Sequence, residues 1–256
     1  MIQFNDFKYF VYSLRDEIVA ITKKYYYSDL DVEHKNDASP VTLADREIEK
    51  YIRSKIEMFF PKHTIIGEEF GTQEKEDKLS SWIIDPIDGT YSFIHRIPLF
   101  TTLVAYCYDS KPIFGMIFQP ITGETVIGGE TCTLYNNRPS MLRTNTTLEG
   151  ATILTTSITN IDRLHDGDKF RELSDEAKVV RTWADGYGYL MLVSGRADVV
   201  VDPKMKLWDI AAVVPIVKGA GGEITDYYGN EPETASSIIA TTNKELHAYV
   251  INKLKK

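Results

Sequence analysis

The stretch SWIIDPIDGT, residues 81–90, places two aspartates three positions apart directly after an apolar strand. A proline between them and Gly89 after them favour a turn, so Asp85, Asp88 and the carbonyl of Ile87 can point at one spot. Oxygen ligands of this kind suit a hard cation such as Mg²⁺. The alternative interpretation is a plain turn, in which Asp88 and Gly89 only bend the chain.

Two further acidic positions lie at the ends of expected elements. Glu68 and Glu69 follow the apolar run HTIIG, and Asp209 opens a helix that ends in the glycine-rich stretch GAGG. Each has an ordinary explanation on its own, because glutamates at strand ends are usually solvated and an aspartate at a helix N-terminus is usually a cap worth about 1 kcal/mol. Together with the DPIDGT turn, they predict carboxylates from three parts of the chain at one metal site.

The surrounding hydrophobic pattern predicts two halves with different organisation. The first half, residues 1–145, combines two amphipathic helices with antiparallel strands, and the second half, residues 146–256, alternates strands with helices. We expect the halves to pack tightly as one unit, with the seam in the polar run RTNTTLEG. The expected helices are 4–25, 43–60, 168–177, 187–194, 208–218 and 245–254, and the expected strands are 63–67, 81–85, 101–108, 113–118, 125–127, 151–156, 178–181, 197–201, 222–225 and 236–240.

Composition excludes several classes of protein. The formal net charge of −8 opposes nucleic-acid backbones and suits cation binding, so we expect no nucleic-acid partner. The sequence has neither a run of eighteen apolar residues nor a signal-peptide pattern, which predicts a cytoplasmic protein without a membrane partner. Cys107 and Cys132 stand apart without metal-ligand spacing, which favours two reduced thiols over a disulfide or a zinc site.

The motifs GEE, DPIDGT and WDIAA followed by GAGG, in this order, resemble the inositol monophosphatase superfamily over nearly the whole chain. The resemblance implies an α+β / α/β fold, specifically a layered αβαβα sandwich, and a Mg²⁺-dependent phosphomonoesterase that forms homodimers. It also implies two or three Mg²⁺ ions held by a set of oxygen ligands. The ligands implied are Glu68, Asp85, the carbonyl of Ile87, Asp88 and Asp209.

This implied activity agrees with the chemistry of the motifs. Phosphate monoesters hydrolyse slowly because their anionic centre repels nucleophiles, so catalysis needs charge neutralisation and a nucleophile that exists near neutral pH. Magnesium with an activated water supplies both, and no protein nucleophile is required. The resemblance assigns catalytic roles to Glu68, Asp45 and Thr90, the last two as a pair that orients the attacking water. Asp45 also fits the third position of a capping box begun by Thr42, and both roles can coexist.

A haloacid dehalogenase type of phosphatase is the competing hydrolase, because it carries a DxDGT motif. In this chain two residues, not one, separate Asp85 from Asp88, which would misplace a general acid relative to an aspartyl nucleophile. The spacing therefore argues against that class.

Three stretches resemble the histidinol-phosphatase branch: SPVTLADRE, PLFTTLVA and TWADGYGY. The resemblance places Asp185 opposite the cationic end of histidinol phosphate, whereas neutral inositol needs no such anion. The alternative for Asp185 is a helix cap. Asp202 stands where the superfamily usually has a substrate-contacting Glu. The expected substrate-binding residues are Asp88, Gly89, Thr90, Asp185 and Asp202.

Other positions depart from that branch. Tyr91 stands where a Lys or Arg is common, while His95 and Arg96 resemble the inositol branch; Arg181 and Arg196 are further charged candidates near the site. An inositol-1-monophosphatase or a broad sugar-phosphate phosphatase is therefore the alternative function. A non-catalytic regulatory protein on the same fold is a third, against which the intact acidic motifs argue.

Overall fold

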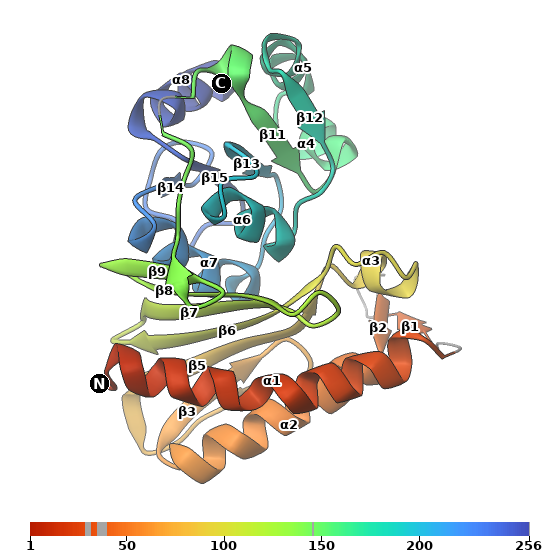
Figure 1. The fold of residues 1–256 in the computed structure, drawn as a ribbon, viewed down its shortest axis with the longest axis vertical. Coiled ribbons are helices and arrows are strands. Elements are labelled where there is room, and N and C mark those ends of the chain that lie inside the picture. The colour runs from red at the N-terminus through yellow and green to blue at the C-terminus, as the bar shows by residue number, and fades with distance from the viewer. Residues whose placement is uncertain (29–31, 35–39, 145, 256) are drawn as a thin grey trace.

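The protein, described here by a computed structural model covering residues 1–28, 32–34, 40–144 and 146–255, is built of alternating helix and sheet layers (Figure 1). The outermost helices at one end are α1 (Phe4–Tyr26) and α2 (Leu43–Phe59), which cover one face of a large sheet. Helices α6 (Gly186–Val193) and α7 (Leu207–Gly219) lie between that sheet and a smaller one. The expected αβαβα sandwich is confirmed.

The large sheet has eight strands in the order β10-β9-β8-β7-β6-β5-β3-β4. All neighbours are antiparallel except β3 and β5, which run parallel. The strands are β3 (His63–Gly67), β4 (Gly71–Gln73), β5 (Asp77–Asp88), β6 (Thr101–Tyr108), β7 (Lys111–Gln119), β8 (Glu124–Gly129), β9 (Cys132–Tyr135) and β10 (Arg138–Pro139). A separate short pair joins β1 (Val32–His34) to β2 (Pro40–Thr42).

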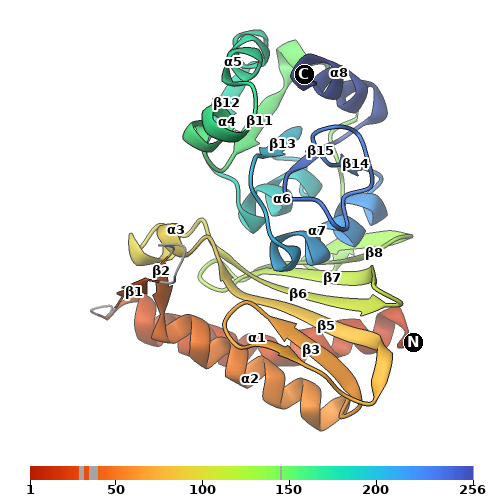
Figure 2. The same cartoon turned by 180° about the vertical axis from the view of Figure 1, so that it is seen from behind.

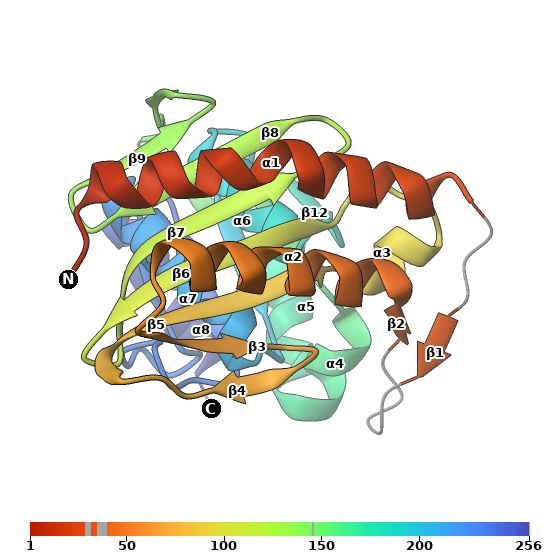
Figure 3. The ribbon, with the colours of Figure 1, turned by 90° about the horizontal axis from the view of Figure 1, so that it is seen from below.

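Helices α1 and α2 run side by side across this sheet, as Figure 3 shows from below. Their apolar faces are buried at the expected helical spacing, and Trp82 of β5 stacks on Phe7 and packs at a tilt against Phe10 of α1. Helix α2 begins with a capping box, because the Thr42 hydroxyl accepts from the Asp45 amide and the Asp45 side chain accepts from the Thr42 amide. Both predicted helices are confirmed.

Helix α7 approaches the opposite face of the large sheet closely because glycines line its path. A Cβ at Gly115 would lie 2.0 Å from the carbonyl oxygen of Ala212, and one at Gly128 would lie 2.7 Å from Cα of Ile216. Any side chain there would push the helix away. The glycines therefore determine how near α7, with Asp209 at its start, lies to the sheet.

The smaller sheet has five strands in the order β12-β11-β13-β15-β14. Strand β11 is parallel to both β12 and β13, so the carboxyl ends of these three strands meet at one edge. Its members are β11 (Thr152–Thr155), β12 (Val179–Arg181), β13 (Val199–Asp202), β14 (Glu223–Thr225) and β15 (Ile238–Thr241). Figure 2 shows α4 (Ile158–Leu164), α5 (Gly167–Glu176) and α8 (Lys244–Leu254) on its outer side.

Most expected elements are present, but some short ones escaped sequence reasoning. Besides strands β1, β2, β4, β9 and β10, these are α3 (Thr90–Ile94), the 3₁₀ turn at Leu148–Gly150 and helix α4, which Ser157 caps. They are too short for a periodic pattern to show. Strand β5 is also longer than expected, because it begins at Asp77 and ends at Asp88, within the DPIDGT motif.

One buried hydrophobic cluster draws side chains from both halves, including Leu103 and Ile117 of the large sheet and Leu190 and Val200 of the second half. The seam expected in RTNTTLEG includes Asn145, which lies outside the described residues, so the boundary between the halves stays a prediction. Ser39, the first residue of the SPVTLADRE stretch, also lies outside them. Among the described residues, no helix combines the length and apolar character needed to cross a membrane.

Candidate active site

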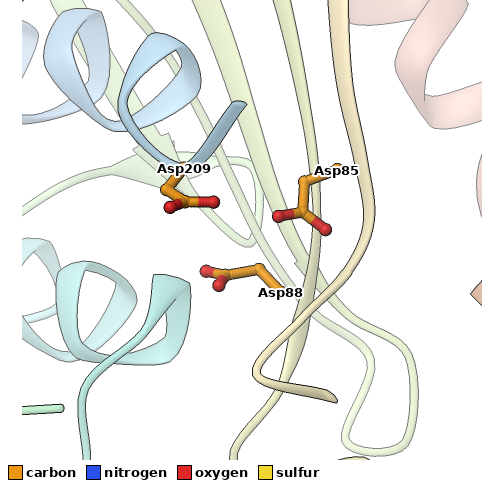
Figure 4. Close-up of side chains that lie close together, drawn as sticks. All are labelled: Asp85, Asp88 and Asp209. Atoms are coloured by element: carbon orange, nitrogen blue, oxygen red, sulfur yellow. The ribbon is translucent and has the colours of Figure 1, made fainter. Parts of the chain in front are cut away.

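Three carboxylates from two distant segments converge where β5 ends and α7 begins (Figure 4). Asp85, Asp88 and Asp209 each offer an oxygen, and these oxygens lie within 4.8 Å of one another. The structure thus brings together residues separated by more than a hundred positions in the chain. Three carboxylate oxygens this close together could hold a divalent metal ion.

An irregularity in β5 turns Asp85 and Asp88 towards the same place. In a regular strand, residues three apart point to opposite faces. Here Asp85 pairs with Leu103 and Asp88 pairs with Thr101, so three steps along β5 match two steps along β6. This bulge puts one extra residue into β5 and lets both carboxylates face α7.

Asp209 reaches the cluster from the first turn of α7. Its Oδ2 accepts a hydrogen bond from the Lys206 amide at 2.7 Å, so the carboxylate caps the amide of the residue that precedes the helix. Burial raises the pKa of Asp209 to about 6 although that backbone hydrogen bond opposes the change. The capping role and the place in the cluster therefore coexist, since a carboxylate has two oxygens.

The cluster is electrostatically unfavourable without a cation. Burial, and then the charge of Glu68, raise the pKa of Asp85 well above its ordinary value; burial and then Asp185 do the same for Asp88. Asp85 is 2% exposed, and its Oδ1 has no hydrogen-bond partner among the described residues. A buried, unpartnered carboxylate oxygen beside two like charges fits a metal ligand well.

Glu68 lies next to this group rather than within it. It follows β3, and its amide donates to the Ile84 carbonyl at 3.2 Å, which places it beside β5. Its negative charge raises the pKa of Asp85 and of Asp209, so its carboxylate is close enough to interact with both. Glu68 and Glu69 also raise the pKa of Asp45.

Asp45 and Thr90 are both at the site but are not bonded to each other in the described structure. Asp45 Oδ2 accepts from the Thr42 amide and hydroxyl, while its buried Oδ1 has no hydrogen-bond partner in the part of the chain that the structure describes. Burial raises the pKa of Asp45 to about 7. The Thr90 hydroxyl instead donates to the Ile87 carbonyl at 3.1 Å. Thr90 is thus turned towards its own loop, and the expected role of Asp45 and Thr90 as a pair that orients the attacking water stays a prediction.

A polar pocket of ≈ 440 Å³ lies beside these groups. Sequence reasoning anticipated Gly89, Thr90 and Asp185 there but missed the hydroxyl and amide groups of the second half. The available signal was position: Thr156 and Thr182 directly follow two parallel strands whose carboxyl ends meet at one edge. The lining residues are Gly89, Thr90, Tyr91, Ser92, Thr156, Ser157, Asn160, Thr182 and Asp185.

Asp185 precedes α6, but its side chain does not cap that helix, so the cap alternative is wrong. The Gly186 amide donates instead to Asp88 Oδ2, which ties the second half to the DPIDGT turn. Asp185 has φ 52° and ψ −162°, an uncommon backbone conformation for a residue with a side chain. Burial, then Asp202 and Asp209, raise its pKa to about 8.

Gly89 brings the DPIDGT turn against Asp185. Its φ is 89°, and a Cβ there would lie 3.2 Å from Asp185 Oδ2 and 2.9 Å from the Leu99 carbonyl oxygen. Only glycine combines this conformation with this close approach.

Asp202 does not line the pocket, and its expected contact with substrate, through water or with a substrate that approaches closer, stays a prediction. It is 1% exposed at the end of β13, and its Oδ1 accepts a hydrogen bond from the Thr156 hydroxyl. Burial raises the pKa of Asp202 to about 6, and hydrogen bonds from Thr156 and Tyr189 limit that rise. Thr156, whose hydroxyl is bonded to Asp202, lines the pocket and presents the polar surface there.

The cationic candidates are bound elsewhere. The Arg196 guanidinium pairs with Glu124 at 2.7 Å, and Arg181 lies over the Trp183 ring. Arg96 donates to the Ser28 carbonyl at 2.9 Å.

Tyr91 and His95, the other two positions that depart from the histidinol-phosphatase branch, differ in whether they reach the pocket. The His95 ring contacts the carbonyl of Tyr91, and Tyr91 alone of the two reaches the pocket.

Comparison with known proteins agrees with this geometry. A model of the inositol monophosphatase family matches residues 5–256. The bifunctional phosphatase IMPL2, chloroplastic, of Arabidopsis thaliana is 38% identical over 254 residues, covering 95% of this chain and 73% of the relative. A histidinol-phosphatase of Chlorobaculum parvum is 37% identical over 203 residues, covering 79% and 78%.

Solved structures give the same result. An inositol monophosphatase from Zymomonas mobilis superposes with a TM-score of 0.87 at 30% identity, and the match covers 100% of each chain. Sequence and fold therefore both group the chain with inositol monophosphatases and the phosphatases related to them. The chain belongs to the inositol monophosphatase family.

Proposed function

We propose that this chain is a Mg²⁺-dependent phosphomonoesterase whose preferred substrate is histidinol phosphate. The observation that carries the proposal is a carboxylate that lines the pocket in addition to the acidic group. Asp85, Asp88 and Asp209 form that group, and Asp185 lines the pocket as a separate carboxylate close to it. A substrate that carries both a phosphate and basic groups matches this arrangement, provided that metal ions compensate the charge of the three-carboxylate group.

Asp85, Asp88 and Asp209, with Glu68 and the Ile87 carbonyl beside them, would hold two or three Mg²⁺ ions. Bound Mg²⁺ would neutralise phosphate charge and make water a stronger nucleophile near neutral pH. The unpartnered Oδ1 of buried Asp85 supports this assignment.

Asp45 is proposed to take a proton from the attacking water. Its Oδ1 is buried without a hydrogen-bond partner among the described residues, and its pKa of about 7 suits proton transfer near neutral pH. The Thr42 hydroxyl and amide hold the other oxygen and fix the orientation of the carboxylate. Thr90 contributes by orienting the Ile87 carbonyl.

Within the pocket, Asp185 is proposed to bind the amine or imidazole of histidinol phosphate. A cation beside this carboxylate would offset the neighbouring negative charges that raise its pKa. Thr156, which Asp202 fixes through a hydrogen bond, offers a hydroxyl to the same ligand. Relatives named histidinol-phosphatase, at 37% identity in Chlorobaculum parvum and 30% in Mycobacterium tuberculosis, support this choice.

An inositol phosphate or a sugar phosphate is the second candidate. The hydroxyl and amide groups of Thr156, Ser157, Asn160 and Thr182 suit a polyol. A relative named fructose-1,6-bisphosphatase/inositol-1-monophosphatase, from Thermotoga maritima, is 32% identical over 212 residues.

A phosphate-release assay over histidinol phosphate, inositol 1-phosphate and fructose 1,6-bisphosphate, with Mg²⁺ or with chelator, tests the proposal. We expect histidinol phosphate to give the highest kcat/KM and chelator to abolish release. Faster turnover of inositol phosphate would support the second candidate, and chelator-resistant release would overturn the metal mechanism.

Asp185→Asn provides a sharper comparison within one protein. The amide has nearly the same shape but no charge, so KM for histidinol phosphate should rise roughly tenfold, which corresponds to about 1.4 kcal/mol. KM for inositol 1-phosphate should change little. Equal effects on both substrates would argue against a cation-binding role.

We also propose a homodimer and a cytoplasmic location, both from the family resemblance, and two halves that meet near residue 145. Sedimentation of the purified protein tests the first, and fractionation of the source cells tests the second.

A further inference from the structure

One face of α2 carries three charged side chains at four-residue spacing: Asp45, Glu49 and Arg53. Residues four apart lie on the same side of a helix, one turn after another. Glu49 is 0% exposed and Arg53 is 8% exposed, and Arg53 Nε donates to Glu49 Oε1 at 2.7 Å. Removing a buried ion pair from water costs free energy, which further hydrogen bonds to the two side chains can offset.

Those contacts go to the turn that follows β3. Glu49 Oε2 accepts from the Glu69 amide at 2.8 Å, and Glu49 Oε1 accepts from the Phe70 amide at 3.2 Å. Arg53 donates to the Gly71 carbonyl at 2.5 Å. The pair therefore binds the backbone of three consecutive residues directly after Glu68.

The packing around this pair leaves little freedom. A Cβ at Gly67 would lie 2.0 Å from Glu49 Oε1 and 2.8 Å from an Arg53 terminal nitrogen. On the other side, the Glu68 amide donates to the Ile84 carbonyl of β5 at 3.2 Å. The backbone of Glu68 is thus held by β5 on one side and by Glu49 through the next residue on the other.

We propose that Glu49 and Arg53 are positioning residues that keep the Glu68 carboxylate beside Asp85 and Asp209. The inference rests on the proposed function, since it assigns the pair to the affinity of the same carboxylates for Mg²⁺. Neither side chain belongs to the three-carboxylate group, and both act through the backbone of the turn. Outer contacts that orient ligands commonly change metal affinity by about 10–100-fold.

Glu49→Gln tests the role with a minimal change of shape. The Mg²⁺ concentration needed for a given rise in melting temperature should increase by at least about tenfold. The Mg²⁺ concentration for half-maximal phosphate release should rise in parallel, while kcat at saturating Mg²⁺ should fall much less. A merely structural role would lower the melting temperature without changing either Mg²⁺ requirement.

Glu57→Gln is the matched control. Glu57 lies one turn further along α2, and its carboxylate accepts from Gln73 at 2.6 Å and Lys75 at 3.1 Å, so it contacts β4 and the residues after it. The same chemical change there should leave both Mg²⁺ requirements, for stabilisation and for phosphate release, within about twofold of the wild type. A shift as large as that of Glu49→Gln would contradict the proposal.

The double variant E49L/R53M separates stability from positioning. Apolar replacement of a buried ion pair is often neutral or stabilising, so the fold should persist while the Glu69 and Phe70 amides lose their acceptor. We expect weakened Mg²⁺ binding at near-normal stability. Wild-type Mg²⁺ dependence in this variant, or failure of both variants to fold, would overturn the proposal. The proposed function fails separately if the wild type is stabilised by Mg²⁺ but hydrolyses no phosphomonoester.

Discussion

Asp88 joins both halves of the chain at the site. Its Oδ2 accepts from the Gly186 amide at the start of α6, and its carboxylate also belongs to the three-residue acidic group. Two lone-pair directions on one side chain thus serve structure and ligand binding together. An amide at this position could keep the first role, because its oxygen still accepts a hydrogen bond, but would lose the charge.

Asp88→Asn should therefore abolish activity without unfolding the protein. We expect phosphate release to fall by at least about 100-fold, since a lost ligand should cost no less than a lost outer contact. The metal-free melting temperature should stay the same or rise, because one of three clustered like charges is gone. Asp109→Asn, in the exposed turn between β6 and β7, is the control and should retain full activity. Unchanged turnover in Asp88→Asn would remove the metal mechanism.

The buried carboxylates make stability depend on pH in a defined direction. Burial raises the pKa of Asp45 to about 7, of Asp209 and Asp202 to about 6, and of Asp185 to about 8. Their folded-state pKa values exceed the unfolded ones, so the folded protein binds more protons between about pH 4 and 8. The stability they contribute is present below pH 4 and is lost as the pH rises through 6 to 8.

The rise in melting temperature that Mg²⁺ produces should consequently be larger at pH 8 than at pH 5.5. Protons compete with the cation for the same oxygens at the lower pH, whereas at pH 8 the metal relieves repulsion that protons no longer neutralise. Thermal unfolding with Mg²⁺ and with chelator at both pH values measures this difference. An equal rise at both, or the same behaviour in Asp88→Asn, would contradict it.

Strand β5 and helix α7 together create the site, and neither does so alone. The bulge between Asp85 and Asp88 turns two side chains to one face, and the capped first turn of α7 directs Asp209 at them. The distance between the two elements depends on how closely the helix can approach the neighbouring strands. Gly115 of β7 lies where a Cβ would meet the Ala212 carbonyl oxygen at 2.0 Å.

Gly115→Ala should destabilise the protein by about 1–3 kcal/mol, because α7 or β7 must shift to admit the methyl group. It should also weaken Mg²⁺ binding, since Asp209 would move away from Asp85. Urea unfolding and the Mg²⁺ dependence of the melting temperature measure the two effects. Gly150→Ala, whose Cβ would meet nothing nearer than 3.8 Å, is the control and should change stability by about 0.5 kcal/mol or less.

Periodicity was sufficient for the long elements. Helices α1 and α2 have apolar residues at helical spacing, and the capping pattern of Thr42 and Asp45 predicts the start of α2. It was insufficient for α4 and for the register of β5, because a seven-residue helix shows fewer than two repeats and a bulge depends on the pairing strand. The pocket wall from Thr156 to Asn160 was missed for that reason.

The two sheets share the helix layer formed by α6 and α7, and a single buried cluster extends from one sheet to the other. The ion pair between Arg196, which follows α6, and Glu124 of β8 also joins the second half to the large sheet, at 2.7 Å. Because the site draws Asp88 and Asp209 from the two sides of this junction, separation of the halves would dismantle it.

The two halves should therefore unfold as one cooperative unit. Native-state hydrogen exchange should give the slowest amides of β6 and β13 the same free energy of opening within about 1 kcal/mol. Val104 and Val200, both fully buried, are suitable reporters. A much lower value in β13 alone would show that the second half opens independently.

The sequence by itself determined the ligand chemistry and the local geometry: hard oxygen donors, a turn at DPIDGT, a capped helix at Asp209 and the order of the main elements. Only the tertiary structure decided that Asp209 meets Asp85, that Asp202 lies behind Thr156, and that Arg196 binds Glu124 rather than the site. The reason is physical. Spacing and capping act within a few residues, whereas the separation of segments more than a hundred positions apart depends on sheet register and on how closely side chains let helices and sheets pack.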